Sequence, residues 1–215
     1  MNKTPVFLAA LVLSSFAVAG VALVAVTHAT LDERIMENTR LAMQRKLESI
    51  IPAGQRTNDP LEDRILVSDP DRLGALQTRV YRVRKDGEPV AVILNPVVPD
   101  GYAGPIELLV SVLADGRLGG VRVLTHHETP GLGDKIDEAK SDWIQEFNGK
   151  SLGHPPEEDW AVKRDGGQFD QFTGATITPR AVVAAVKKAL LFVRSQGERL
   201  YSEPSVGGES NRRAS

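Results

Sequence analysis

Residues 170–179 of the chain are Asp170-Gln171-Phe172-Thr173-Gly174-Ala175-Thr176-Ile177-Thr178-Pro179. A loop of small residues leads here into a predicted helix, with Thr178 as the expected N-cap and Pro179 at the first helical position, where its missing N–H costs nothing. Free N–H groups and the helix dipole at such an N-terminus favour a phosphate. Gly174 lets a ligand approach the backbone, and Thr173 and Thr176 bring hydroxyls beside it. The residues alone allow two interpretations, an anion-binding loop or an ordinary loop that ends in a helix cap.

The rest of the chain predicts an α+β domain. Apolar residues recur at helical spacing from Pro179 to Val193 and, earlier, at 134–147, so a helix is expected in each segment. Runs of β-branched and other apolar residues predict strands at 65–67, 79–84, 89–94, 106–114 and 118–124. Turn residues at 85–88 and 115–117 join the last four strands into two hairpins, which favours an antiparallel sheet packed by helices. Arg82 and Arg84 alternate with Tyr81 and Val83, so one face of this sheet is expected to be open to solvent.

The N-terminal segment from Val6 to Val26 contains no charged residue and has the length of ~20 residues that a helix needs to cross a membrane. Lys3 precedes it and Asp32 follows it, so the positive-inside rule places the N-terminus in the cytoplasm and the remainder outside. A cleavable signal peptide is the alternative, because Ala17-Val18-Ala19 resembles a cleavage site, although the apolar run continues beyond it. A buried helix of a soluble protein is the third interpretation.

These features divide the chain into four segments. Residues 1–28 are expected to form a cytoplasmic N-terminus and a transmembrane anchor, and residues 29–60 a helical linker. Residues 61–201 are expected to form the folded domain. Residues 202–215 are rich in Ser, Gly, Glu, Asn and Arg, and we expect them to be disordered.

Composition excludes several classes of function. Lys and Arg number 26 and Asp and Glu 28, so the net charge of −2 gives no electrostatic case for binding nucleic acid. Cysteine is absent, which removes disulfides, thiolate nucleophiles and Cys-ligated zinc or iron–sulfur sites, so electron transfer would need a bound cofactor. His126 and His127 are adjacent without an evident third ligand, so no metal site is expected. No Gly-x-Ser-x-Gly motif of a hydrolase is present.

The opening stretch resembles the flavinylation motif of the flavoprotein subunits of bacterial membrane electron pumps, in which an Asp precedes Ser/Thr-Gly-Ala-Ser/Thr. This family comprises the G subunit of the Rnf-type (Rsx-type) electron transport complex and the C subunit of the Na⁺-translocating NADH:quinone oxidoreductase. Two further segments, 101–106 and 126–133, resemble the family in the same order along the chain. The short chain and the residues of the motif at 170–179 favour the Rnf type.

The resemblance implies that FMN is joined covalently to Thr176 through a phosphoester. A flavin transferase makes this bond from FAD with Mg²⁺, and Asp170 is implied to be part of what the transferase recognises. The remaining cofactor-binding residues are expected to be Thr173, Gly174, Ala175, Tyr102, Glu128, Thr129 and Leu132. No side chain is expected to be catalytic, because the redox chemistry belongs to the flavin.

The resemblance also implies a function and a location. The chain is expected to be a flavoprotein subunit of a membrane-bound electron transport complex, relaying electrons between other subunits in a process coupled to ion translocation, and not catalytic alone. It is expected to cross the bacterial inner membrane once, with its FMN domain on the periplasmic side. A hypothesis of another class is an exported, membrane-anchored binding or assembly module without a redox cofactor.

Overall fold

The structure, a computed structural model, describes residues 4–206. The chain divides into two compact units after Lys46, and each is described by itself. The first unit is formed by helix α1 (Thr4–Ile50), whose last residues from Leu47 belong to the second unit. Helix α1 thus runs through most of the segment expected to be a helical linker.

Helix α1 contains one segment that is long and apolar enough to cross a membrane. Leu11–His28 has a mean hydropathy of 2.0, and none of it is buried. Phe16, Val21 and Leu23 are among its exposed large side chains. A core helix of a soluble protein buries such residues, so that third interpretation does not fit this segment.

The second unit is built on a sheet of six strands that pair only in the antiparallel sense. Strand β5 pairs with β3 and β4 along one side and with β6 along the other. Asp86 and Gly87 both have positive φ, as a tight hairpin turn between β2 and β3 requires. The predicted strands and both hairpins are confirmed; the strands are β1 (Arg64–Val67), β2 (Thr78–Lys85), β3 (Glu88–Leu94), β4 (Val97–Val98), β5 (Ile106–Leu113) and β6 (Leu118–Thr125).

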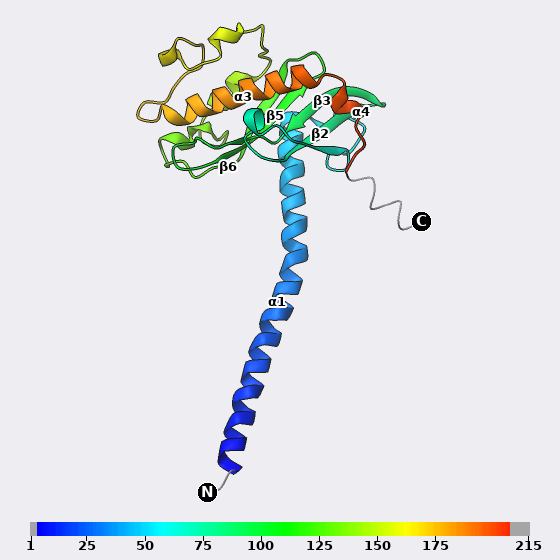
Figure 1. Cartoon of the computed structure of the whole chain (residues 1–215), viewed down its shortest axis with the longest axis vertical. Helices are drawn as coiled ribbons and strands as arrows, with labels where there is room; N and C mark the ends of the chain where they lie inside the picture. The colour runs from blue at the N-terminus through cyan, green and yellow to red at the C-terminus, as the bar shows by residue number, and fades with distance from the viewer. Residues whose placement is uncertain (1–3, 207–215) are drawn as a thin grey trace. The chain divides into compact units, whose positions relative to one another are not determined.

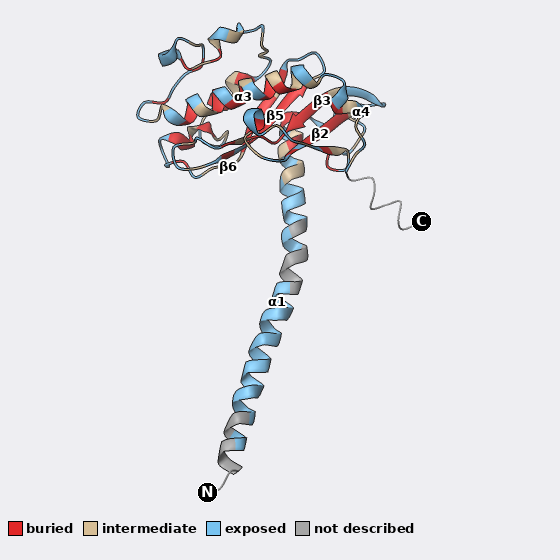
Figure 2. Ribbon diagram, viewed as in Figure 1, coloured by how far each residue is buried: buried red, intermediate tan, exposed pale blue. Residues whose placement is uncertain are grey.

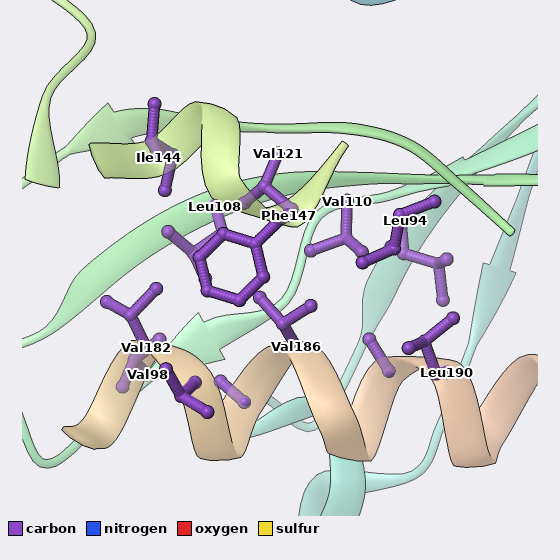
Figure 3. Close-up of a cluster of buried hydrophobic side chains, with 14 of the residues drawn as sticks. Leu94, Val98, Leu108, Val110, Val121, Ile144, Phe147, Val182, Val186 and Leu190 are labelled. Atoms are coloured by element: carbon purple, nitrogen blue, oxygen red, sulfur yellow. The ribbon is translucent and has the colours of Figure 1, made fainter. Parts of the chain in front are cut away.

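Helix α3 (Ile177–Gln196) lies across one face of the sheet (Figure 1). Its stripe of Val182, Val186 and Leu190 is buried against β4 and β5, and buried residues follow the strands and one side of the helix (Figure 2). Figure 3 shows Phe147 between the helix and the sheet residues Leu108 and Val121. Each Å² of apolar surface removed from water stabilises the fold by about 25 cal/mol, so this layer is the main source of stability.

The remaining helical elements are short and connect the strands to α3. They are η1 (Ala53–Gln55), α2 (Pro70–Leu73), η2 (Gly133–Ile136), η3 (Trp143–Phe147), η4 (Glu157–Asp159), η5 (Lys163–Asp165) and α4 (Arg199–Ser202).

The single helix predicted at 134–147 is wrong. The segment forms η2 and η3 with a turn between them. The Ser141 hydroxyl donates to the carbonyl of Lys135 at 2.6 Å and accepts from the backbone N–H of Trp143 at 3.2 Å. Such side-chain bonds give the backbone an alternative to helical pairing. The apolar positions still reach the core, since Ile136, Ile144 and Phe147 are buried.

The prediction of a solvent-exposed sheet face is also wrong. Arg82 is only 3% exposed, and its guanidinium forms an ion pair with Asp63, which also binds Arg84 at 3.0 Å. The carbonyls of Tyr201 and Glu203 accept hydrogen bonds from the same guanidinium. The segments on either side of the sheet in sequence therefore fold over this face and neutralise its charges.

Defined contacts extend beyond the expected domain end at 201. The hydroxyl of Ser205 donates to the carbonyl of Glu62 at 2.8 Å. The backbone N–H of Val206 donates to the carbonyl of Arg64 at 2.9 Å. Ser205 and Val206, in the first part of the segment expected to be disordered, thus lie beside the start of β1. The rest of that segment, residues 207–215, lies outside the described residues.

The Asp63 cluster generates a stability prediction. Asp63→Asn leaves the buried guanidinium of Arg82 without its counter-charge, so the free energy of unfolding should fall by about 3 kcal/mol. Asp115→Asn is the matched control, because Asp115 pairs with Arg117 at the surface and both side chains are half-exposed. That control should lose less than about 1 kcal/mol. Urea unfolding of the detergent-purified chain, followed by tryptophan fluorescence, measures both, and equal losses would contradict the prediction.

Candidate functional site

A cavity of ≈ 280 Å³ lies where three loops meet the N-terminus of α3. The loops are the segment before β5, the segment after β6 and the loop that leads into α3. The cavity is lined by Tyr102, Glu128, Thr129, Leu132, Gly133, Gly174, Ala175, Thr176, Ile177 and Thr178.

The loop before α3 turns at Gly174. This residue has φ +82°, a left-handed conformation that glycine adopts without strain, and the N–H of Ala175 donates to the carbonyl of Phe172 at 3.1 Å. A Cβ at Gly174 would also lie 3.4 Å from Leu132 on the facing loop. The glycine therefore makes the turn and keeps the cavity open between the two loops.

Aromatic packing holds the start of this loop. Phe172 is buried, and its ring lies 5.1 Å from that of Trp143 in an edge-on arrangement. The indole N–H of Trp143 donates to the carbonyl of Asp170 at 2.9 Å. Because α3 holds the other end, the residues between Phe172 and Ile177 have a fixed place at the cavity.

Thr176 immediately precedes α3. Its side chain makes no capping hydrogen bond to the helix, and it is partly exposed and lines the cavity. The structure corrects the expected N-cap: Thr178 lies inside α3, and its buried hydroxyl donates to Glu128 at 2.5 Å. A Thr hydroxyl thus stands at a helix N-terminus, where backbone N–H groups and the helix dipole favour a bound phosphate.

Glu128 connects all three loops. Its side chain is 4% exposed; one carboxylate oxygen accepts from the N–H of Ala103 at 3.1 Å and the other from the hydroxyl of Thr178. Its own N–H donates to the ring of His126 at 3.1 Å. This carboxylate, buried beneath the cavity, ties the segment before β5 to the first turn of α3.

Apolar side chains form the rim of the cavity. Tyr102 is 68% exposed, Leu132 42% and Ile177 47%. Large apolar groups gathered around a cavity mark a place where a ligand or partner is covered. The arrangement fits a ligand with an anionic group at the helix N-terminus and a flat apolar ring against the rim.

Seven of the predicted site residues meet at this cavity, and two do not. Thr173 is exposed on the turn, and Asp170 lies outside the cavity with its carboxylate 2.5 Å from the ammonium of Lys163. Partial burial, and then the charge of Asp170, raise the pKa of the Glu146 carboxyl nearby. Asp170 therefore belongs to a group of paired charges beside the loop. The seven that line the cavity are Tyr102, Glu128, Thr129, Leu132, Gly174, Ala175 and Thr176.

Three further residues line the cavity without having been predicted as site residues. They are Gly133, Ile177 and Thr178. Ile177 and Thr178 lie within the stretch 170–179. The sequence around Thr178 could not show whether its hydroxyl caps the helix or donates to Glu128. Gly133 is required because a Cβ there would lie 2.5 Å from a carboxylate oxygen of Glu128.

A larger cavity of ≈ 660 Å³ lies near the C-terminus of α3 and the β5–β6 turn. Apolar residues such as Val112, Leu190 and Val193 line it, and no Ser or Thr is among the described residues of its lining. We assign the candidate site to the smaller cavity because a hydroxyl, a glycine turn and a helix N-terminus converge there. Among residues 4–206, no group of three His, Asp or Glu side chains is placed to hold a metal ion.

Comparison with known families agrees with this assignment. Residues 101–191 match the FMN-binding domain, and residues 1–50 match the RnfG N-terminal region. The first match begins at the loop before β5 and ends within α3, so it contains every residue that lines the candidate cavity.

Full-length relatives give the same result. The chain is 50% identical over 200 residues to the G subunit of the ion-translocating oxidoreductase complex of Pseudomonas aeruginosa strain UCBPP-PA14, covering 93% of this chain and 94% of that one. It is 44% identical to the corresponding protein of Vibrio cholerae serotype O1 strain M66-2, over 91% of this chain and 93% of that one. It is 46% identical to the corresponding protein of Shewanella loihica, over 90% of this chain and 92% of that one. The predicted resemblance is therefore confirmed, and the chain belongs to the family of G subunits of the Rnf-type ion-translocating oxidoreductase complex, with its FMN-binding domain.

Proposed function

We propose that Thr176 carries FMN through a phosphoester between its hydroxyl oxygen and the FMN phosphate. The observation that supports this most directly is the position of the Thr176 hydroxyl, which is free of capping at the N-terminus of α3 and faces the cavity. The backbone of the Gly174 turn approaches the same place without a side chain in the way. The helix dipole offsets part of the negative charge of a phosphate held there.

The rim residues then receive the ring of the flavin. Tyr102 and Leu132 come from different loops of the cavity lining, and both are exposed. Contact with them removes apolar surface of both partners from water. Thr129 and the loop backbone offer polar groups for the ring edge.

The bond is made by a flavin transferase that uses FAD and Mg²⁺. The Thr176 oxygen forms a new bond to the phosphorus of the FMN half, the pyrophosphate bond of FAD breaks, and AMP leaves. The hydroxyl proton is released, so the product is the chain plus FMN less one water. Asp170 lies close to the loop, where its exposed carboxylate is paired with Lys163, and it is part of what the transferase recognises.

As a member of an oxidoreductase complex, the chain works with other subunits and is not catalytic alone. A flavin accepts one or two electrons and can connect carriers of either type. The relatives are named for ion translocation, and we propose that electron flow through this chain is coupled to ion movement in the same way. The role of the chain is to hold the flavin at a fixed place in that relay.

The chain is membrane-anchored through α1. We propose that the membrane is the inner membrane and that the domain faces the periplasm, because Lys3 precedes the apolar segment and Asp32 and Glu33 follow it. A covalent bond keeps the cofactor with the protein in a compartment that is not supplied with free flavin.

The covalent site generates a prediction on mass. In cells with an active flavin transferase, the denatured wild-type chain should gain the mass of FMN less one water, and Thr176→Ala should gain none. Thr176→Ser should retain the gain because it keeps the hydroxyl. Thr129→Ala is the matched control, since Thr129 is another hydroxyl residue of the cavity lining. Intact-mass spectrometry of each detergent-purified chain measures the gain.

Two outcomes would overturn this assignment. A gain that persists in Thr176→Ala but disappears in Thr129→Ala would move the bond to the other loop. A wild-type chain without any gain, in cells where the transferase modifies another substrate, would favour the binding or assembly module instead. The same spectra also show whether the N-terminal segment is retained or cleaved.

The orientation generates a second prediction. The chain has no cysteine, so a single Leu76→Cys variant can be labelled uniquely, and Leu76 is 80% exposed. A membrane-impermeant maleimide should label this variant in cells whose outer membrane alone has been permeabilised, to the same extent as in lysed cells. Labelling only after lysis would place the domain in the cytoplasm.

A further inference from the structure

Glu128 is the one charged side chain among the described residues that line the cavity. Its two carboxylate oxygens accept from an amide N–H and a hydroxyl, which are neutral donors. Because Glu128 is buried, its negative charge is poorly screened by solvent, so its field acts strongly on whatever occupies the cavity.

The backbone is shaped around this carboxylate. A Cβ at Gly101 would lie 2.9 Å from one oxygen of Glu128, and a Cβ at Gly133 would lie 2.5 Å from the other. A real Cβ does not approach an oxygen so closely, so the carboxylate has room only because both positions are glycine. Glu128 is therefore held in one place from two sides, in addition to its two hydrogen bonds.

The N-terminus of α3 makes the burial of this charge tolerable. Thr178, which donates to Glu128, lies in the first turn of the helix, where the dipole presents partial positive charge. The same dipole faces the place where the phosphate is expected. The site thus combines a positive helix end for the phosphate with a fixed negative group in the cavity lining.

This inference rests on the proposed function: we propose that Glu128 is a positioning residue whose fixed negative charge lowers the reduction potential of the FMN held at Thr176. Reduction adds negative charge to a flavin, and a nearby carboxylate opposes that change. Its hydrogen bonds to Ala103 and Thr178 keep the charge and the two loops at constant separation. The potential of the flavin is thereby set below the value that the same site would give without this charge.

The experiment is a spectroelectrochemical titration of the flavinylated, detergent-purified chain. Glu128→Gln keeps the shape, because the amide oxygen can accept a hydrogen bond from Ala103 and the amide nitrogen can donate to Thr178. The variant should carry FMN to the same extent by intact mass, and its midpoint potential should shift to a more positive value. Glu88→Gln, which removes an exposed carboxylate at the β2–β3 turn, is the charge-matched control and should leave the potential unchanged.

Thr178→Val separates the charge from the hydrogen bond. It removes the donor to Glu128 but keeps the carboxylate, so the potential should stay at the wild-type value or become more negative. A purely structural role for Glu128 predicts the opposite pattern, in which Glu128→Gln leaves the potential unchanged and Thr178→Val, which loses a hydrogen bond, shifts it to a more positive value; that result would overturn the inference. When Glu128→Gln does not fold, a positive shift in Thr178→Val alone overturns it.

The failure of this inference differs from the failure of the proposed function. A wild-type chain without the FMN mass gain refutes the covalent site itself. A flavinylated wild type whose potential equals that of flavinylated Glu128→Gln leaves the covalent site intact and refutes only the role of Glu128.

Discussion

The burial of α3 on the sheet is the constraint on which the rest of the structure depends. Val182, Val186 and Leu190 are buried where α3 packs against β4 and β5, so the helix has one register and its N-terminus comes to one place. Phe172, held by Trp143, fixes the other end of the preceding loop. With both ends set by apolar packing, the short segment 173–176 has little freedom, and its last hydroxyl is presented by the fold without help from a cap.

The second consequence is that segments distant in sequence share one polar connection. Glu128 follows β6, Ala103 precedes β5 and Thr178 lies in the first turn of α3, yet the carboxylate accepts from both of the others. A buried acceptor left without its donors costs roughly 1–3 kcal/mol, and more when it is charged, so the loops are tied together by the penalty of separating them. The site is pre-formed because core packing brings the loops close and the hydrogen bonds of Glu128 then fix their relative positions.

Local patterns predicted the elements, and distant partners decided the exceptions. Runs of β-branched residues and turn signals located all of the long strands, and the apolar stripe located α3. The helix predicted at 134–147 failed because Ser141 bonds to the backbone on both sides of it, which apolar spacing does not report. The prediction for Arg82 failed because its covering groups, Asp63 and the carbonyl of Tyr201, come from segments with no visible relation to β2. Thr178 has the sequence position of a cap, and only the fold shows that its hydroxyl is used by a carboxylate from another loop.

The size of the cavity gives a physical reason for the covalent bond that we propose there. At ≈ 280 Å³ it is smaller than the ~300–1,000 Å³ of most ligand sites, and its apolar rim stays open to solvent. Such a site encloses only part of a flavin, so contacts alone would hold it weakly. The phosphoester that we propose at Thr176 would retain the flavin without enclosing it. The ring of a flavin held in this way would stay exposed at the rim formed by Tyr102 and Leu132, where another redox protein of the complex could approach it.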